Sequence, residues 1–402
     1  MRFQPHAGAV VMGLMMGASL AQVPSGSSGA DETDRQRAFA LFAQHRMPEA
    51  VPLLRAALAR APQDTAAHEA LGVALVSVAA TETDPARAVA DRLEARRELK
   101  RARDLGDTSD LSRVLLAQVR EDGSAAPLSA QPDVDAALRA GEAAFGRGDW
   151  PAAIAAYARA WSLDSTSYLA ALYLGDSYFA TRDMDRAGEW FAKAVALDPN
   201  QELAYRYWGD ALMGQGKIRE ARAKYIEGIA ADPYRETSLN GLHNWLMATT
   251  LNLRKPPLTL PAAPTTDAHG HTRISIDAAQ LSGNAGAAAA WLMYSVERSA
   301  WQKGTFKKEF PQAKAYRHSL REEMAALNLV LQMYRENLAK DPAQRDDSLE
   351  RLATLSDAGL LEPFVLFNAA DAQLAQDYPA YREAHRDRLI AYLDQYLVPP
   401  AP

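Results

Sequence analysis

Side chains that could bind a metal ion come together at Asp267, His269 and His271. Alternate residues of an extended segment point to the same side, so both imidazoles would face one ligand. A structural zinc site needs four ligands, and no fourth ligand stands nearby. The stretch also belongs to a proline-rich segment, which is typical of a solvated linker. The sequence therefore predicts no metal site and no cofactor.

Two histidines have carboxylates near them and could act in general acid–base chemistry. His318 is followed by Glu322 and Glu323, and His385 lies within ten residues of Asp377 and Asp387. The adjacent glutamates should point about 100° apart on a helix and should not cooperate. We interpret His318 through helix-end electrostatics and His385 as a half-buried ring.

Motifs of the common catalytic architectures are absent from the sequence. It contains no HExxH, no GxSxG, no phosphate loop ending in Gly-Lys-Ser/Thr and no GxGxxG after a strand. It also lacks cysteine, which excludes disulfides, zinc–cysteine sites, iron–sulfur clusters, thiol catalysis and cysteine lipidation. We therefore predict a non-catalytic protein.

The composition of the 402 residues is that of a globular protein of two or three domains. Hydrophobic residues make up 48% and charged residues 23%, which rules out wholesale disorder. The net charge is −6, and the densest basic stretch, Arg92 to Arg103, is interleaved with acidic residues. This pattern is typical of a solvated helix face, so we expect no nucleic-acid partner.

The N-terminus has the pattern of a secretory signal. Arg2 and His6 precede an apolar run over residues 7–20, which is too short to cross a bilayer comfortably. Small residues around Ala21 suit a signal peptidase. We expect a signal peptide at 1–21, a flexible spacer at 22–30, a periplasmic or secreted protein and no membrane span after cleavage. An uncleaved anchor is the alternative.

A 34-residue period organises the middle of the chain. Five positions keep this spacing, and each suits a helix pair: small residues let the helices approach, an aromatic fills a gap and proline separates units. These positions are Gly141, Gly175 and Gly209; Ala153, Ala187 and Ala221; Tyr157, Phe191 and Tyr225; Ala160, Ala194 and Gly228; and Pro199 and Pro233. Residues 134–250 are therefore predicted as three repeats and a capping helix, 236–250.

Residues 31–122 show the same pattern in divergent form. Leu71-Gly72 opens a copy whose partner positions, Ala95, Leu99 and Ala102, come 11 residues late. Eleven residues are close to three helical turns, so longer helices would keep the same face inward. A helix at 111–121 and a linker at 123–133 are expected to follow.

A proline-rich linker at 251–272 is expected to precede a helical domain at 273–402. One short strand is possible at 273–277. Residues 287–301 are apolar on most faces and should be buried. Ser319 and Glu322 have the spacing of a capping box, which predicts the start of a long helix.

The repeat resembles the tetratricopeptide repeat, whose pattern runs Leu-Gly, Tyr, Ala, aromatic, Pro. The best copy carries Leu174-Gly175, Tyr178, Ala187, Phe191, Ala194 and Pro199. The first copy is degenerate, because Ala140 and Ala144 replace the leucine and the tyrosine. The resemblance implies an all-α fold: a helix-turn-helix solenoid followed by a smaller helical C-terminal domain.

In this family the first helix of each repeat lines a concave groove. Members that grip a terminal carboxylate usually carry Asn after the glycine, whereas this chain has Glu142, Asp176 and Asp210. Carried over position by position, the groove comprises Arg139, Glu142, Phe145, Tyr173, Asp176, Phe179, Arg206, Tyr207, Asp210, Met213, Asn240 and Asn244.

Such an acidic and aromatic groove is expected to favour a protein or peptide partner with a basic or apolar segment. Two alternatives stay open. Rings such as Tyr173 and Phe179 would instead pack repeat against repeat. Asp176 and Asp210 would instead pair with Arg139 and Arg206, leaving the groove electrostatically quiet.

The leading hypothesis is an exported interaction scaffold, and the alanine- and arginine-rich composition is compatible with a bacterial source. A second hypothesis is an envelope-acting hydrolase in the C-terminal domain, recruited by the repeats. A third is a structural homo-oligomer formed through the aromatic C-terminal helices.

Overall fold

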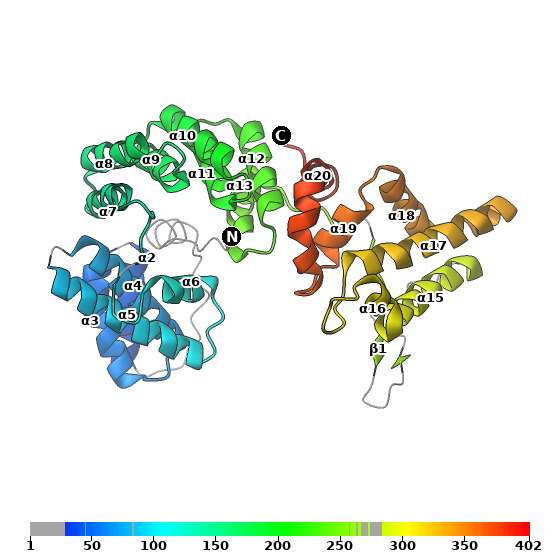
Figure 1. Ribbon diagram of the computed structural model, residues 1–402, viewed down its shortest axis with the longest axis horizontal. Coiled ribbons are helices and arrows are strands. Elements are labelled where there is room, and N and C mark those ends of the chain that lie inside the picture. The colour runs from blue at the N-terminus through cyan, green and yellow to red at the C-terminus, as the bar shows by residue number, and fades with distance from the viewer. Residues whose placement is uncertain are drawn as a thin grey trace. The chain divides into compact units, whose positions relative to one another are not determined.

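The computed structural model describes residues 29–402 except 45, 83, 125, 257, 263, 267–271 and 274–283 (Figure 1). In this part of the chain the regular structure is helical apart from one short hairpin, so the all-α prediction is confirmed. The chain divides into two compact units, Met1–Trp245 and Leu246–Pro402. The predicted signal peptide and the stretch from Asp267 to His271 lie outside the described residues.

The first five helices that the structure describes in the N-terminal unit pack in sequence order around one apolar core, which runs from Ala38 to Val119. They are α2 (Gly29–Ala43), α3 (Met47–Arg60), α4 (Thr65–Thr81), α5 (Pro85–Asp104) and α6 (Asp110–Gln118). Asp84 caps α5 by accepting a hydrogen bond from the Ala86 amide, as its position before Pro85 predicts.

Longer helices in this region accommodate the 11-residue delay of the positions that partner Gly72. Helices α4 and α5 have 17 and 20 residues, longer than the 13 and 14 of α9 and α10 in the best repeat. A Cβ on Gly72 would lie 2.5 Å from Leu99 Cγ, so these two residues pack directly. The predicted pairing of Gly72 with Leu99 is confirmed.

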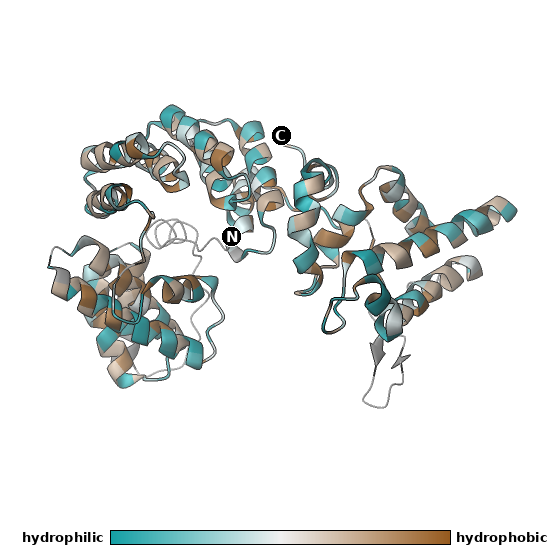
Figure 2. Ribbon diagram, in the orientation of Figure 1, coloured by the Kyte–Doolittle hydropathy of each residue, from teal (hydrophilic) through white to brown (hydrophobic). Residues whose placement is uncertain are grey.

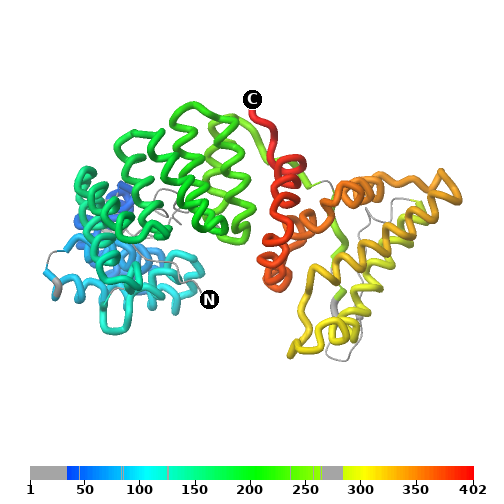
Figure 3. The backbone as a smooth tube through the Cα atoms, turned by 45° about the horizontal axis from the view of Figure 1, so that its top comes forward, coloured from blue at the N-terminus to red at the C-terminus, as the bar shows by residue number. Residues whose placement is uncertain are grey.

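Six further helices of this unit form three antiparallel pairs in 34-residue register, and in Figure 3 the green tube reverses from each helix to the next. Each first helix packs on the second helix of its own pair, and each second helix packs on the next pair. The helices are α7 (Pro132–Gly146), α8 (Trp150–Leu163), α9 (Tyr168–Ala180), α10 (Met184–Leu197), α11 (Glu202–Gly214) and α12 (Ile218–Ala231).

Glycine and an aromatic ring set the closeness of each pair. A Cβ built on Gly141, Gly175 or Gly209 would lie 2.3 to 2.4 Å from a ring carbon of the aromatic at the matching position of the second helix. Those rings are Tyr157, Phe191 and Tyr225. A side chain of any size would therefore force the helices apart, which is the role that the spacing predicts for these glycines.

The array continues into a short 3₁₀ turn, Glu236–Leu239, and helix α13, Asn240–Thr249, where one helix from 236 to 250 is predicted. The Trp245 side chain is fully buried, and its indole Nε1 donates to the Ile218 carbonyl at 3.0 Å. A Cβ on Gly241 would also meet the Tyr225 ring at 2.4 Å. Residues 240–245 thus cover α12 as a capping helix should.

Among its described residues, the C-terminal unit has a core of five helices. Helix α17 packs on α15, α18 and α19, and α19 packs on α20. The elements are the hairpin β1 (Thr265–Thr266) and β2 (Thr272–Arg273); helices α15 (Ala285–Ala300), α16 (Phe306–Glu309), α17 (Leu320–Lys340), α18 (Asp347–Asp357), α19 (Leu361–Asn368) and α20 (Tyr378–Tyr392); and single turns at Trp301–Thr305, Pro342–Gln344, Leu374–Asp377 and Leu393–Leu397.

Part of the predicted linker lies on this unit. The Arg254 amide donates to the Leu397 carbonyl at 2.9 Å, and Arg254 Nη1 donates to the Gln395 carbonyl at 2.6 Å. The Leu258 side chain is buried. Of the strand predicted at 273–277, only Arg273 is described, and it pairs with Thr265.

Apolar and polar residues alternate around most helices, as the brown and teal bands of Figure 2 show. This is the pattern of helices that bury one side and expose the other. Among the described residues, no helix combines the length and the hydrophobicity that a bilayer crossing requires.

Candidate functional site

Three carboxylates, Glu142, Asp176 and Asp210, occupy one repeat position on the first helices α7, α9 and α11. Each follows the glycine that contacts the second-helix ring, and each is half-buried. Burial raises the pKa of Glu142 to about 7 and that of Asp176 to about 8, and it also raises the pKa of Asp210. The row is therefore only partly ionised at neutral pH, and it is less negative than its residue types suggest.

The second-helix ring distinguishes one carboxylate from another. The Tyr225 hydroxyl donates to Asp210 Oδ1 at 2.7 Å, which favours the ionised form of Asp210 and partly offsets its burial. In the preceding repeat the matching ring is Phe191, which has no hydroxyl. Asp176 thus lacks this donor, and only the more distant charge of Arg206 opposes its desolvation.

Phe191→Tyr is expected to lower the pKa of Asp176 by about 1–2 units, because a hydrogen bond to a charged group contributes about 1.5–3 kcal/mol. Carbon-detected NMR titration of the aspartate carboxyl carbons measures this. The reverse change, Tyr225→Phe, should raise the pKa of Asp210. If neither pKa moves, the ring hydroxyl does not control these acids.

Phe191→Tyr should also change how the stability of the folded protein depends on pH. The raised pKa of Asp176 means that the folded state binds its proton more tightly than the unfolded state does. Its contribution is complete below the unfolded value of 3.8 and is lost as pH rises towards about 8. Phe191→Tyr should therefore reduce the loss of stability between those pH values.

Two arginines of the predicted groove have acidic partners on their own helices. Arg139 Nε donates to Asp135 at 2.9 Å, and its Nη2 donates to the Ala126 carbonyl at 2.8 Å. Arg206 is only 4% exposed, lies 3.8 Å from Glu202 and places its guanidinium 4.6 Å from the centre of the Tyr207 ring. Arg139 thus pairs within its own helix, whereas the charge of Arg206 lies near Glu202 and also favours the ionised forms of Asp176 and Asp210.

Three rings of the predicted groove lie in the core. Phe145, Tyr173 and Tyr207 are 6%, 3% and 5% exposed, and they pack against the rings of Trp150, Tyr157 and Phe191 at centroid distances of 4.9, 5.1 and 5.8 Å. Tyr173 and Tyr207 pack repeat against repeat, as the alternative interpretation held for Tyr173, whereas Phe145 packs on Trp150 of its own repeat. All three rings present little surface to a partner.

The remaining predicted residues keep some exposure. Phe179, Met213 and Asn240 are half-buried, and Asn244 is exposed. Together with the three carboxylates and Arg139, they are the residues of the predicted groove that keep exposed surface. Their role in binding stays a prediction.

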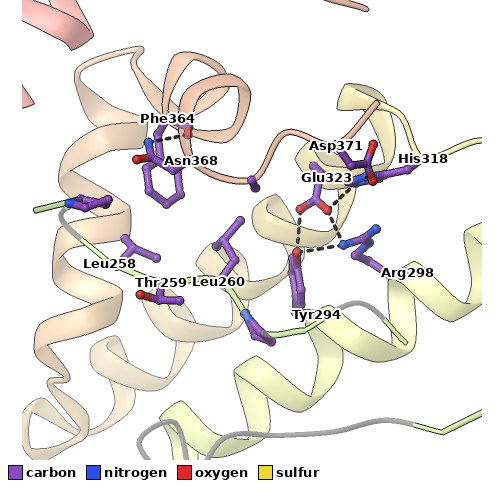
Figure 4. A pocket seen from close by; sticks show the side chains of 13 residues that line it. Leu258, Thr259, Leu260, Tyr294, Arg298, His318, Glu323, Phe364, Asn368 and Asp371 are labelled. Atoms are coloured by element: carbon purple, nitrogen blue, oxygen red, sulfur yellow. Dashed lines mark hydrogen bonds and ion pairs between the residues drawn. The ribbon is translucent and has the colours of Figure 1, made fainter. Parts of the chain in front are cut away.

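A second group of polar residues, which we call the Arg298 cluster, lies in the core of the C-terminal unit (Figure 4). Arg298 Nε donates to Glu322 at 3.0 Å, its Nη1 pairs with Glu323, and the Tyr294 hydroxyl donates to Glu323 at 2.7 Å. His318 Nε2 lies 2.7 Å from Glu323, and its Nδ1 lies 2.8 Å from Asp371.

This cluster corrects two sequence-based interpretations. The capping box forms by half: the Ser319 hydroxyl accepts from the Glu322 amide, but the Glu322 carboxylate turns to Arg298 and Tyr316. Glu322 and Glu323 were also expected not to cooperate, yet both pair with one guanidinium. The long arginine side chain reaches both carboxylates because it approaches from a different helix, α15.

Two carboxylates, Glu323 and Asp371, favour the charged form of His318. Burial alone would lower the pKa of His318, but its hydrogen bonds to Glu323 and Asp371 outweigh this and raise the pKa. His385, in contrast, is half-buried with its ring 4.9 Å from that of Tyr381. In the described part of the chain, no three His, Asp or Glu side chains are arranged to hold a metal ion.

One sequence signal could have revealed the Arg298 cluster. Residues 287–301 are predicted to be buried, and Tyr294 and Arg298 stand four residues apart on that helix, on the same face. A buried arginine requires a carboxylate partner. The adjacent pair Glu322-Glu323, at the start of another predicted helix, is the nearest double negative charge after it.

Stacked antiparallel helix pairs of fixed length, with glycine and an aromatic in register, define a helical-repeat solenoid. Residues 138–202 match the model of the tetratricopeptide repeat family, and this part of the chain belongs to that family. Such repeats are generally non-catalytic and form protein–protein interaction scaffolds. No curated protein sequence matches the chain.

Several solved structures are similar to parts of the chain. The Sgt2 TPR domain from Aspergillus fumigatus shares 23% identity over 30% of this chain and 82% of its own, with a TM-score of 0.29. The first TPR of Spaghetti (RPAP3), bound to the HSP90 peptide SRMEEVD, shares 22% identity over 29% and 94%, with a TM-score of 0.28. Pseudomonas aeruginosa pilF shares 18% over 55% and 84%, with a TM-score of 0.27.

Proposed function

We propose that helices α7, α9 and α11 bind an extended segment of a partner protein that carries basic side chains among apolar ones. The observation that supports this is the row of Glu142, Asp176 and Asp210, one half-buried carboxylate in each repeat. Their ionisation is opposed by burial. A lysine or arginine of a partner would supply the missing positive charge and offset that cost.

Apolar contacts come from the same surface. Phe179 and Met213 are half-buried beside the carboxylates on α9 and α11. Aromatic and methionine side chains give large contact area, and methionine adapts to varied partners. A segment that alternates basic and apolar residues would therefore satisfy both kinds of site along the three helices.

The three carboxylates should make the repeats selective between partners. Glu142, Asp176 and Asp210 occupy the position where carboxylate-gripping relatives usually carry Asn. A partner that ends in acidic residues would meet three acids at this position, which opposes its binding. A basic segment meets no such repulsion.

Binding of a basic segment should become tighter as pH rises from 6 to 9. Glu142 and Asp176, with pKa values of about 7 and about 8, must lose their protons to pair with a cation. The probes are acetylated and amidated dodecapeptides with a common leucine–serine background and central lysines, glutamines or glutamates. Isothermal titration calorimetry should rank lysine first, with a gain of up to ~10-fold over this pH range.

The variant pair Asp176→Asn with Asp210→Asn should remove both the lysine preference and most of the pH dependence. A matched control, Glu189→Gln with Glu220→Gln, removes two exposed carboxylates from the second helices α10 and α12 and should change neither. If the lysine peptide binds the asparagine variant as tightly as it binds the wild type, the proposal is wrong.

We further propose that the protein acts outside the cytoplasm. The charged start, the apolar run at 7–20 and the small residues before position 22 support an export signal. The mature protein would then begin at Gln22. N-terminal sequencing of protein from the cell envelope or medium tests this, and an intact N-terminus there would favour the anchored alternative.

A further inference from the structure

A cavity of about 280 Å³ opens beside the Arg298 cluster, wholly within the C-terminal unit. At the ~30 Å³ that one liquid water molecule occupies, it has room for roughly nine non-hydrogen atoms, about the size of a free leucine molecule. Pro256 and residues 258–261 form one wall, and residues of α15, α17, α19 and the loop after α19 form the others (Figure 4).

One side of the cavity is apolar. Leu258 and Phe364 are buried and Leu260 is half-buried, and all three line the cavity, together with Pro256, Pro261 and Ala369. In Figure 4, Leu258 and Leu260 lie across from the charged side chains. This wall suits a hydrocarbon group rather than a second polar one.

Two polar side chains that line the cavity, Arg298 and Asn368, each offer a hydrogen-bonding group that the protein does not use. Arg298 bonds through Nε and Nη1, while Nη2 has no hydrogen bond to the described residues. The Asn368 amide nitrogen donates to the Phe364 carbonyl at 2.8 Å and to the Tyr392 hydroxyl at 2.6 Å, which leaves its carbonyl oxygen available. A ligand that bonds to both must carry a hydrogen-bond acceptor and a hydrogen-bond donor.

The ionisable side chains that line the cavity are of both kinds: the bases Arg298 and His318, and the acids Glu323 and Asp371. Glu322 lies behind Arg298, where the Tyr316 hydroxyl donates to it at 3.0 Å and burial raises its pKa. A lone anion or a lone cation would leave one uncompensated charge in this partly enclosed place, which is unfavourable.

Asp371 is the charge within reach of an incoming cation. Its side chain is 53% exposed, whereas those of Arg298, His318 and Glu323 are at most 8% exposed. One Asp371 oxygen accepts from His318, and the other accepts from the amides of Gln373 and Leu374 at 2.8 Å each. These bonds fix the carboxylate beside the cavity.

From this geometry we propose that the cavity binds a small zwitterion, a free α-amino acid with an apolar side chain. Its carboxylate accepts from Arg298 Nη2, its ammonium group donates to Asp371, and its side chain packs on Leu258, Leu260 and Phe364. The site lies in the C-terminal unit and does not depend on peptide binding by the repeats.

The test uses the full chain with three probes that share an isobutyl group: L-leucine, isovalerate and isoamylamine. Calorimetric titration should detect L-leucine, and the carboxylate and the amine should each bind at least ~10-fold more weakly, because each leaves one polar partner of the site unsatisfied. Tightest binding of isovalerate or of isoamylamine overturns the zwitterion assignment, and so does no binding of L-leucine at millimolar concentration.

Two variants test where the ligand binds. Asp371→Asn keeps an oxygen for the Gln373 and Leu374 amides but removes the charge, and it should weaken L-leucine at least ~10-fold while isovalerate binds no worse. Leu260→Trp should fill the cavity and block all three probes. The matched control Asp357→Asn changes a carboxylate that is 72% exposed and paired with Arg335, and it should have no effect. L-leucine binding that both cavity variants leave unchanged overturns the site.

Discussion

Arg298→Met should lower the free energy of unfolding of the C-terminal unit by about 4 kcal/mol, the largest effect that we expect of any single substitution. The Arg298 side chain is 5% exposed, and those of Glu322 and Glu323 are at most 1% exposed. Removing the guanidinium leaves two carboxylates buried without their main counter-charge. Breaking a buried ion pair in this way costs about 3–5 kcal/mol.

Differential scanning calorimetry of the full chain, compared with the wild type, measures this loss. The matched control is Arg335→Met, which removes an exposed partner of Asp357 and should cost less than about 1 kcal/mol. The triple variant Arg298→Met, Glu322→Gln, Glu323→Gln should regain part of the loss, because it removes the uncompensated charges. Equal effects of Arg298→Met and Arg335→Met would contradict the account of the cluster.

Gly175→Ala should destabilise the repeat array by about 3 kcal/mol, the second largest effect. The new Cβ would lie 2.4 Å from Phe191 Cε1, inside the van der Waals contact distance. Phe191 is fully buried and also packs on Tyr207, so its ring has nowhere to move without separating α9 from α10. Overpacking of a close-packed core typically costs about 1–3 kcal/mol.

Chemical denaturation followed by circular dichroism gives the size of this effect, and Gly188→Ala on α10 is its matched control. A Cβ on Gly188 would meet only Trp208, with Nε1 nearest at 3.4 Å, an ordinary contact. The alanine there should be neutral or stabilising by up to about 1 kcal/mol, from helix propensity. The pair Gly175→Ala with Phe191→Leu should recover part of the loss. Equal stabilities of the two alanine variants would show that close approach does not set the repeat geometry.

The repeats could be predicted because their determinants are local and periodic. Gly175 and Phe191 stand within one 34-residue unit, and the unit recurs, so the sequence itself carries the contact. The lengthened pair could be predicted for the same reason, since Gly72 and Leu99 keep a face in common when three turns are added.

The Arg298 cluster could not be predicted in this way. Arg298 and Glu322 are 24 residues apart on different helices, and no repeat marks that pairing. Local rules described Glu322 as part of a capping box, and they held for its amide but not for its carboxylate. The tertiary ion pair prevailed because a buried guanidinium without a counter-charge is far less favourable than an unfinished cap.

The candidate groove was predicted by residue type but not by exposure. The residue types predicted aromatic rings and acids on the first helices of the repeats, and the structure has them on those helices. It could not show that Tyr173 and Tyr207 are buried while Phe179 and Met213 keep some surface. It also could not show that Asp176 lies beside a phenylalanine and Asp210 beside a tyrosine hydroxyl, which sets their acidities apart.

Hydrogen exchange with the lysine-containing dodecapeptide bound tests the central claim, that the first helices bind a basic segment. Amides of α7, α9 and α11 should gain protection at pH 8.5, while those of α8, α10 and α12 change little, and Asp176→Asn with Asp210→Asn should abolish the gain. Protection confined to the second helices or to the C-terminal unit would contradict it.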